Sequence, residues 1–491
     1  MNVLKLILNL LIALFLLVVV GVVVSGGQVF SLGENVSLSL RSTGTPGLLL
    51  ALLVLVRLVV GGVLAFPRTS RGRFSPVRIL LTWFAVSLAF FLYSRFLGIP
   101  LFWGGYFVFF LGGWLAAILL RWGGRTLVVR LSARRRLLFL ALSAAAFFLI
   151  AYGEEPDAPH SRNDCGIWTR YDQSYYLRMA SDLAGAGLPR EAYAYGLGYP
   201  LLGAPLVHLV PVNPFFLPNL LLYVLAVCTF YLAGTRLLGG AGAILAVGLS
   251  LGPPFIEFFC IPWNNAVSVA AVGVLLHLGL GARCPPLLAG LVAGGVLGMV
   301  FASRYVDAAL LFPLFLAALR GRGGRAFLSA ALPGVLLILL VLLSHWLILG
   351  SPLTTPYYSR GETGIGDQSL AAYRPREIPR HLYEVFWDPF SLTGLVRGSE
   401  RSPILARAFI LVCLPLGLAA LLWDRRGRVG PGWSAYLSSL FLGWAFYGSF
   451  FAAGAFDIIF GNLRYYLPWL PGAVVLSVYG LNRAAGWRSE E

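Results

Sequence analysis

The chain has 491 residues, of which 58% are hydrophobic and 12% are charged, and its mean hydropathy is +0.81. An average soluble domain carries roughly 25% charged residues, so this composition excludes an ordinary soluble protein. The formal net charge of +17 comes largely from arginines in short loops between apolar runs, as in the cytoplasmic loops of membrane proteins. The positive charge therefore indicates which loops face the cytoplasm, and it does not indicate that the protein binds nucleic acid.

Apolar runs of about twenty residues, each long enough to cross roughly 30 Å of hydrocarbon, recur along the chain and predict an all-α polytopic membrane protein. The first run is too long for a signal-peptide core and has no small-residue cleavage pattern behind it, so we expect an uncleaved span. After it, the alternation of apolar and serine residues at 36–40 predicts a small hairpin. The first five predicted spans lie at 3–25, 47–66, 79–97, 103–121 and 137–152.

The apolar run Tyr199–Val210 decides the topology of all that follows it. It is short and is interrupted by prolines, which favours an interfacial or re-entrant segment over a span. If it does not cross, the later arginine clusters lie in the cytoplasm; if it crosses, all of them lie outside. The charge rule selects the first option and predicts about 14 spans, with both termini cytoplasmic. The later spans are expected at 215–235, 240–254, 265–281, 286–302, 305–319, 328–349, 403–423, 432–451 and 465–482.

The predicted topology divides the chain into three parts. Residues 1–136 form an N-terminal addition of four transmembrane helices without an assigned function, and residues 483–491 form a cytoplasmic tail. The transmembrane core at 137–482 carries two large extracytoplasmic loops, at 153–211 and 350–402, and an interfacial helix is expected at 380–387 in the second. Cys165 and Cys260 both fall outside the membrane, so a disulfide between them is one possibility.

The first large loop contains a polar stretch, 164–200, with helical spacing at its centre. Asp172 lies in the first turn of this expected helix, where the dipole favours an ionised carboxylate, and Gly185 and Gly187 end the helix. The pattern thus predicts a charged carboxylate beside two phenols, with a plain helix-capping role for the acid as the alternative. The residues that share its side of the helix, by intervals of three and four, are Tyr175, Tyr176, Met179 and Asp182.

Two arginines stand at the outer ends of predicted spans, on the same face as Asp172. Ionisable residues near span ends are costly to bury and are often functional, which makes Arg304 and Arg464 candidate ligands for an anion. Arg304 could instead form a plain ion pair with Asp307, three residues on, and Arg464 could simply snorkel to the interface.

Three motifs in this order resemble GT-C membrane glycosyltransferases, and most resemble the branch of protein O-mannosyltransferases and lipid A aminoarabinose transferases. The first is DQSYYLRMA at 172–180 followed by GYPL at 198–201, which is similar to that family's first extracytoplasmic loop. The others are LSLGPPFIEFFCIPWNN at 249–265 and FGNLRYYLP at 460–468. The resemblance extends over roughly residues 137–482.

The resemblance implies an enzyme that transfers a sugar from a polyprenyl-phosphate donor to a lipid, glycan or protein acceptor. The reaction would occur on the extracytoplasmic face of a membrane, here expected to be a bacterial inner membrane. Inversion in one displacement needs one general base, and Asp172 matches the family's loop aspartate. Arg304 or Arg464 would stabilise the leaving phosphate. The resemblance also implies substrate contacts for Tyr175, Tyr176, Tyr199, Trp263, Asn264, Asn265 and Tyr465, with packing as the alternative for Tyr175 and Tyr176 and helix capping for the asparagines.

The chain departs from the family's pattern at several acidic positions. Many relatives carry a second acid where this chain has Gln173, and Asn264 and Asn265 stand at an acidic position of the next outer loop. Fewer hard oxygen ligands weaken the case for a divalent cation, although such a cofactor could still take Glu154, Glu155 or Asp157. A transporter or lipid-linked-sugar flippase is the alternative function, for which the sequence lacks the expected internal repeat, and a non-catalytic envelope subunit is a third.

Overall fold

The computed structural model describes nearly three fifths of the chain. Several predicted features lie outside the described residues: the spans at 79–97 and 103–121, all but two residues of the span at 47–66, the interfacial helix at 380–387, and Arg464, Glu155 and Asp157. The described residues are 2–25, 28–31, 37–40, 50, 53, 133–154, 171–185, 187, 193–251, 256–354, 356, 374–379, 414–423, 431–449 and 465–484.

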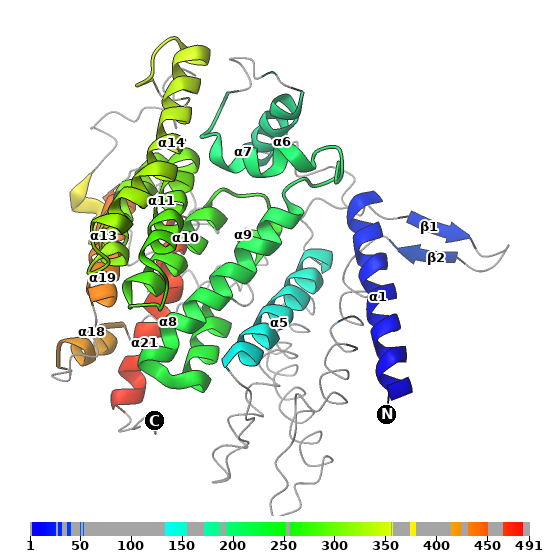
Figure 1. Cartoon of the computed structure of the whole chain (residues 1–491), viewed down its shortest axis with the longest axis horizontal. Coiled ribbons are helices and arrows are strands. Elements are labelled where there is room, and N and C mark those ends of the chain that lie inside the picture. The colour runs from blue at the N-terminus through cyan, green and yellow to red at the C-terminus, as the bar shows by residue number, and fades with distance from the viewer. Residues whose placement is uncertain are drawn as a thin grey trace, which may run out of the picture. The chain divides into compact units, whose positions relative to one another are not determined.

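The chain forms two units, residues 1–164 with 251–260 and residues 165–250 with 261–491. The first unit contains the apolar helices α1 (Asn2–Ser25) and α5 (Ala133–Glu154), and α5 packs against the short α9 (Glu257–Cys260) (Figure 1). Its strands β1 (Gln28–Ser31) and β2 (Ser37–Leu40) pair antiparallel, which confirms the predicted hairpin. Cys260 is buried, and Cys165 lies outside the described residues, so the possible disulfide between them stays a prediction.

The second unit is a bundle of mostly apolar helices whose described ends match the predicted spans closely. Its first long helix, α8 (Phe216–Leu251), contains a break at Gly239, whose φ of 68° suits glycine. This break separates the two spans predicted at 215–235 and 240–254. The later helices are α10 (Asn265–Gly279), α11 (Pro286–Ser303), α12 (Tyr305–Leu310), α13 (Phe312–Leu319), α14 (Gly324–Leu349), α18 (Leu414–Trp423), α19 (Pro431–Ser449) and α21 (Leu470–Ala484).

One predicted span is divided in the structure. The run at 305–319 forms two short helices, α12 and α13, which are separated at Leu311. The cause is Pro313, which has no N–H to donate to the carbonyl of Ala309 and whose ring crowds the preceding turn. The high hydropathy of the run predicted one span at 305–319, whereas the structure divides it at this proline.

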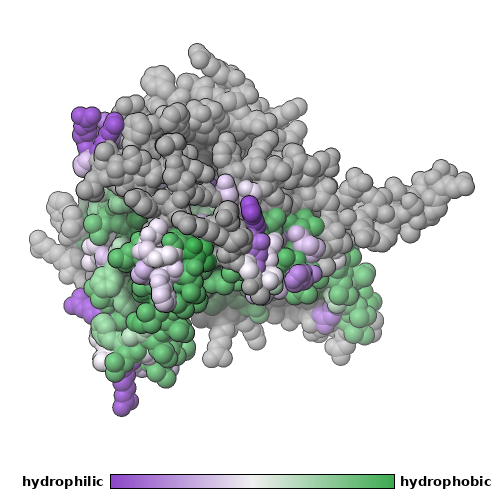
Figure 2. Space-filling model, turned by 90° about the horizontal axis from the view of Figure 1, so that it is seen from above, coloured by the Kyte–Doolittle hydropathy of each residue, from purple (hydrophilic) through white to green (hydrophobic). Residues whose placement is uncertain are grey.

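Within the described residues, three helices are long and apolar enough to cross a membrane: Phe216–Gly240, Pro286–Ser303 and Gly324–Leu349. Leu328, Leu332 and Leu347 project from α14 and are exposed, as expected for a helix that faces lipid. Hydrophobic residues also make up much of the described surface in Figure 2. The structure therefore supports a helical integral membrane protein, while the count of about 14 spans stays a prediction.

Two short helices carry the loop that the sequence analysis singled out. α6 (Tyr171–Ala184) ends where its glycines predict, with the N–H of Gly187 bonded to the carbonyl of Asp182 at 3.0 Å. α7 (Gly198–Gly203) continues into a single 3-10 turn, Ala204–Leu206. Six helical residues rise only about 9 Å, so the segment after Gly198 is too short to cross a membrane as a helix.

Candidate functional site

Asp172 lies in the first turn of α6 and faces the segment that leads into α7. The hydroxyl of Tyr195 donates a hydrogen bond to Oδ1 of Asp172. The Tyr195 ring also contacts Tyr175, at 5.9 Å between centroids, and Tyr176, at 5.1 Å. The structure thus confirms that Asp172, Tyr175 and Tyr176 face one side. It adds Tyr195, which the sequence analysis missed although it lies in the conspicuous AYAYG stretch at 192–196.

A small apolar core lies beneath this carboxylate. Met179 of α6 packs with Tyr193, Ala194 and Leu197 against Leu349 at the end of α14. Asp182, which was expected to share the side of Asp172, lies 3.9 Å from the guanidinium of the exposed Arg178. The acid at the start of α6 therefore faces phenols, whereas the acid near its end faces a cation.

Two glycines fix the segment after Tyr195 against the end of α11. A Cβ atom on Gly196 would lie 2.4 Å from the carbonyl oxygen of Ala302, and one on Gly198 would lie 2.4 Å from Oγ of Ser303. Real side chains do not approach so closely, so only glycine allows this contact. Since Arg304 follows Ser303 directly, the partner of Asp172 and this arginine lie at the same end of α11.

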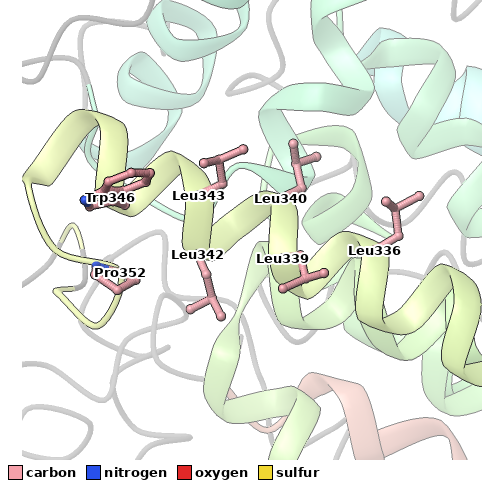
Figure 3. A pocket seen from close by; sticks show the side chains of 7 residues that line it. All are labelled: Leu336, Leu339, Leu340, Leu342, Leu343, Trp346 and Pro352. Atoms are coloured by element: carbon pink, nitrogen blue, oxygen red, sulfur yellow. The ribbon is translucent and has the colours of Figure 1, made fainter.

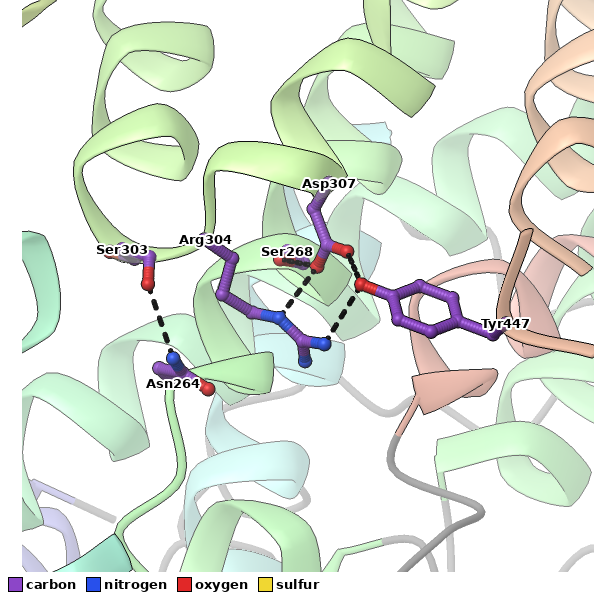
Figure 4. Close-up of polar contacts among 6 residues, drawn as sticks. All are labelled: Asn264, Ser268, Ser303, Arg304, Asp307 and Tyr447. Carbon is purple, nitrogen blue, oxygen red and sulfur yellow. Dashed lines mark hydrogen bonds and ion pairs between the residues drawn. The ribbon is translucent and has the colours of Figure 1, made fainter. Parts of the chain in front are cut away.

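Arg304 stands between α11 and α12 in an extended backbone conformation, with φ −152° and ψ 94°. Its Nε lies 3.2 Å from Oδ2 of Asp307, and its Nη2 donates to the hydroxyl of Tyr447 at 2.9 Å. Asp307 also accepts hydrogen bonds from Ser268, at 2.6 Å, and from Tyr447. Figure 4 shows Asp307 of α12, Ser268 of α10 and Tyr447 of α19 converging on Arg304.

The Arg304 cluster is deeply buried and internally balanced in charge. The Asp307 side chain is fully buried, and the Arg304 side chain is 11% exposed. A buried carboxylate tolerates such a position when a cation and hydrogen-bond donors surround it, as they do here. The plain ion pair foreseen as an alternative for Arg304 is therefore present, and an additional contact with phosphate stays a prediction.

Two phenol rings flank the guanidinium of Arg304. Its central carbon lies 5.5 Å from the ring centroid of Tyr447 and 5.4 Å from that of Tyr465. The two rings stack at 5.2 Å with an angle of 23° between their planes. Cation–π attraction of this kind holds the guanidinium in place. Tyr465 is half-buried, and Arg464, the other candidate anion ligand, precedes it in the sequence.

Three further residues that were predicted to contact substrate are buried among the helices: Asn264, Asn265 and Tyr199. Asn264 makes no side-chain cap for α10; instead its Nδ2 donates to the carbonyl of Ser303 at 3.2 Å, so the capping alternative is wrong for this residue. Asn265 is buried in the first turn of α10. Tyr199 is fully buried, with its hydroxyl bonded to Asn219 at 3.0 Å and its ring stacked on Phe215, which is a packing role.

A second polar cluster, not foreseen from the sequence, surrounds His345 near the end of α14. Its Nδ1 lies 3.2 Å from the carbonyl of Pro352, which can only accept, so this nitrogen carries the proton. Its Nε2 then accepts from the hydroxyl of Tyr305 at 2.9 Å. The Tyr193 ring packs on His345 at 5.7 Å, and burial raises the pKa of Tyr193 to about 12. The cluster ties α14 and α12 to the segment that carries Tyr195.

An apolar pocket of about 550 Å³ opens beside this end of α14. It is lined by Leu336, Leu339, Leu340, Leu342, Leu343, Trp346 and Pro352 (Figure 3). The described residues contain no group of three His, Cys, Asp or Glu side chains that could hold a metal. Glu154, one of the three acids named above as possible cation ligands, is the last residue of α5 in the first unit.

Comparison with known proteins adds no family to these observations. No protein-family model, curated protein or solved structure matches the chain. The resemblance to GT-C glycosyltransferases therefore stays a prediction from the motifs, and the site is interpreted below from its geometry and chemistry.

Proposed function

We propose that this protein is an integral membrane glycosyltransferase, with about 14 spans, which transfers a sugar from a polyprenyl-phosphate donor to an acceptor on the extracytoplasmic face of a bacterial inner membrane. The observation that carries the proposal is the pair Asp172–Tyr195, held at the end of α11 that also bears Arg304. A half-buried carboxylate that accepts a hydrogen bond from a phenol is suited to take a proton from an acceptor group.

The proposed step is a single displacement. The acceptor oxygen or nitrogen attacks the anomeric carbon while Asp172 takes its proton, and the bond from that carbon to the phosphate oxygen breaks. The electron pair of this bond leaves with the polyprenyl phosphate, so negative charge develops there and a guanidinium would stabilise it. Because Asp307 already neutralises Arg304, Arg464 is the stronger candidate for this contact.

The surroundings of the site suit a lipid-linked donor. α14 is one of the helices long enough to span, and its apolar pocket ends at Trp346 and Pro352. The neighbouring His345 belongs to the cluster that contacts the Tyr193–Gly198 segment. Part of an isoprenoid chain would therefore fit in the pocket with its phosphate directed to the level of the site.

Incubation of the purified protein with a polyprenyl-phosphate sugar and candidate acceptors tests the proposal. We expect release of polyprenyl phosphate, detected by mass spectrometry, that depends on the acceptor and is lost in Asp172→Asn. Asp182→Asn is the matched control, since it removes an acid from the same helix that faces Arg178 instead. Movement of the lipid-linked sugar across a vesicle bilayer with no cleavage of its phosphate bond would establish the flippase alternative instead.

The orientation can be tested separately by labelling of introduced cysteines. A cysteine placed within 153–165 should react with an impermeant thiol reagent from outside, and one within 122–135 only after permeabilisation, because the arginine-rich loop is expected in the cytoplasm. The reverse pattern would place Asp172 on the wrong face for the proposed reaction.

A further inference from the structure

We propose that Tyr195 is a positioning residue for Asp172: its hydroxyl fixes one carboxylate oxygen and so directs the other toward the acceptor. This inference rests on the proposed function, because it assigns Tyr195 a part in the proton transfer ascribed to Asp172. Neither the motifs nor the resemblance pointed to Tyr195; the assignment comes from the contact between its hydroxyl and Oδ1 of Asp172.

The chemistry of the pair defines which group holds the proton. A phenol keeps its proton far more tightly than a carboxylic acid does, so Tyr195 is the donor and Asp172 the acceptor. A hydrogen bond to a charged acceptor is stronger than one between neutral groups. Tyr195 thus holds the base in one orientation.

The position of Tyr195 is itself set from two sides. Its ring lies against Tyr175 and Tyr176 of α6, so the aromatic contacts and the hydrogen bond involve the same helix. Its backbone continues directly into Gly196, which lies against the carbonyl of Ala302 too closely for any side chain. A base that must meet a substrate within hydrogen-bond distance needs such a fixed support.

The test compares Tyr195→Phe with Tyr193→Phe. Both variants lose one phenol hydroxyl from the same segment, but the hydroxyl of Tyr193 contacts Ser344 and not a carboxylate. We expect Tyr195→Phe to lower turnover roughly 10- to 100-fold. The Michaelis constant for the donor should change little. For Tyr193→Phe we expect a clearly smaller loss of turnover.

Turnover at the wild-type rate in Tyr195→Phe would overturn the proposal, and so would a raised Michaelis constant at unchanged turnover, because a positioning residue for the base acts on the proton transfer and not on donor binding. A double-mutant cycle in thermal unfolding tests the pair without any substrate. Tyr195→Phe and Asp172→Ala combined should lower the midpoint by clearly less than the sum of their separate shifts. Additive shifts would show that the two side chains do not interact. If the midpoint shifts are non-additive but the protein shows no transferase activity, the contact between Tyr195 and Asp172 is confirmed and the proposed function is refuted.

Discussion

Arg304, which follows the C-terminal end of α11, and Arg322, which lies between α13 and α14 and reaches the loop before α11, have contrasting surroundings. At the C-terminal end of α11, Arg304 is bound by a carboxylate and a phenol and lies over two aromatic rings. Near its N-terminal end, and among the described residues, Arg322 donates to the backbone carbonyls of Ala318, Cys284, Leu278 and Ala282, at 2.9 to 3.1 Å. The helix between them has 18 residues, which rise about 27 Å.

The contrast separates an arginine that joins helices from one that belongs to a polar site. Arg322 satisfies carbonyls at the ends of α10 and α13 and of the loop before α11, which any cation of the right shape and reach could do. Arg304 is surrounded by ionisable and aromatic side chains from several elements, next to the contact of Gly196 and Gly198 with α11. We therefore expect the catalytic site at the Arg304 end of α11 and a purely structural role for Arg322 at the other end.

The largest effect on stability is expected from breaking the buried pair at the Arg304 end. Asp307→Leu leaves a buried guanidinium without its carboxylate and should lower the free energy of unfolding by about 3–5 kcal/mol. Replacing both residues, as Arg304→Met with Asp307→Leu, should recover much of that loss. Denaturant unfolding in detergent measures both variants, and a single variant as stable as the double would show that the pair is not coupled.

A smaller effect is expected from the glycine contact at the same end. Gly196→Ala places a Cβ atom 2.4 Å from a backbone carbonyl oxygen that cannot rotate away, so the segment must shift. We expect a cost of about 1–3 kcal/mol together with slower transfer, because Tyr195 moves with the segment. Gly187→Ala is the control, since nothing lies within 4 Å of its Cβ position. Equal behaviour of the two variants in unfolding and transfer assays would contradict the assigned contact.

The smallest effect is expected at the Arg322 end. Arg322→Lys keeps the charge but loses the planar fork that reaches four carbonyls, and should lower stability by about 1–2 kcal/mol. The protein that remains folded should transfer sugar at the wild-type rate, as measured after correction for the folded fraction. A transfer defect with normal stability would remove the distinction between the two ends of α11.

The sequence predicted the described helices well because their ends carry strong local signals. The span expected at 286–302 is α11, Pro286–Ser303, where a proline begins the helix and a charged residue follows its end. The loop helix was also predicted, with Asp172 in its first turn and glycines after its last. Such features depend on periodicity and on punctuating residues, which can be read from neighbouring positions alone.

The partners within the site could not be predicted in the same way. The contact of Asp307 with Tyr447 joins residues 140 apart, and that of Tyr305 with His345 joins residues 40 apart. Hydropathy and spacing do not specify which helices pack together, so neither pair has a local signal. Tyr195 is closer to Asp172, at a separation of 23 residues, but its role depends on how the segment turns back along α6.

The most direct test of the central claim is the turnover of Asp172→Asn. The substitution preserves the size and hydrogen-bonding shape of the side chain but removes its charge and basicity, and asparagine suits the start of a helix about as well as aspartate. Purified variant and wild type are compared for transfer from a polyprenyl-phosphate sugar, with donor binding and thermal unfolding measured alongside. We predict a loss of about 10² to 10⁴ in turnover, with donor affinity and stability largely retained. Transfer at the wild-type rate would show that Asp172 is not the base.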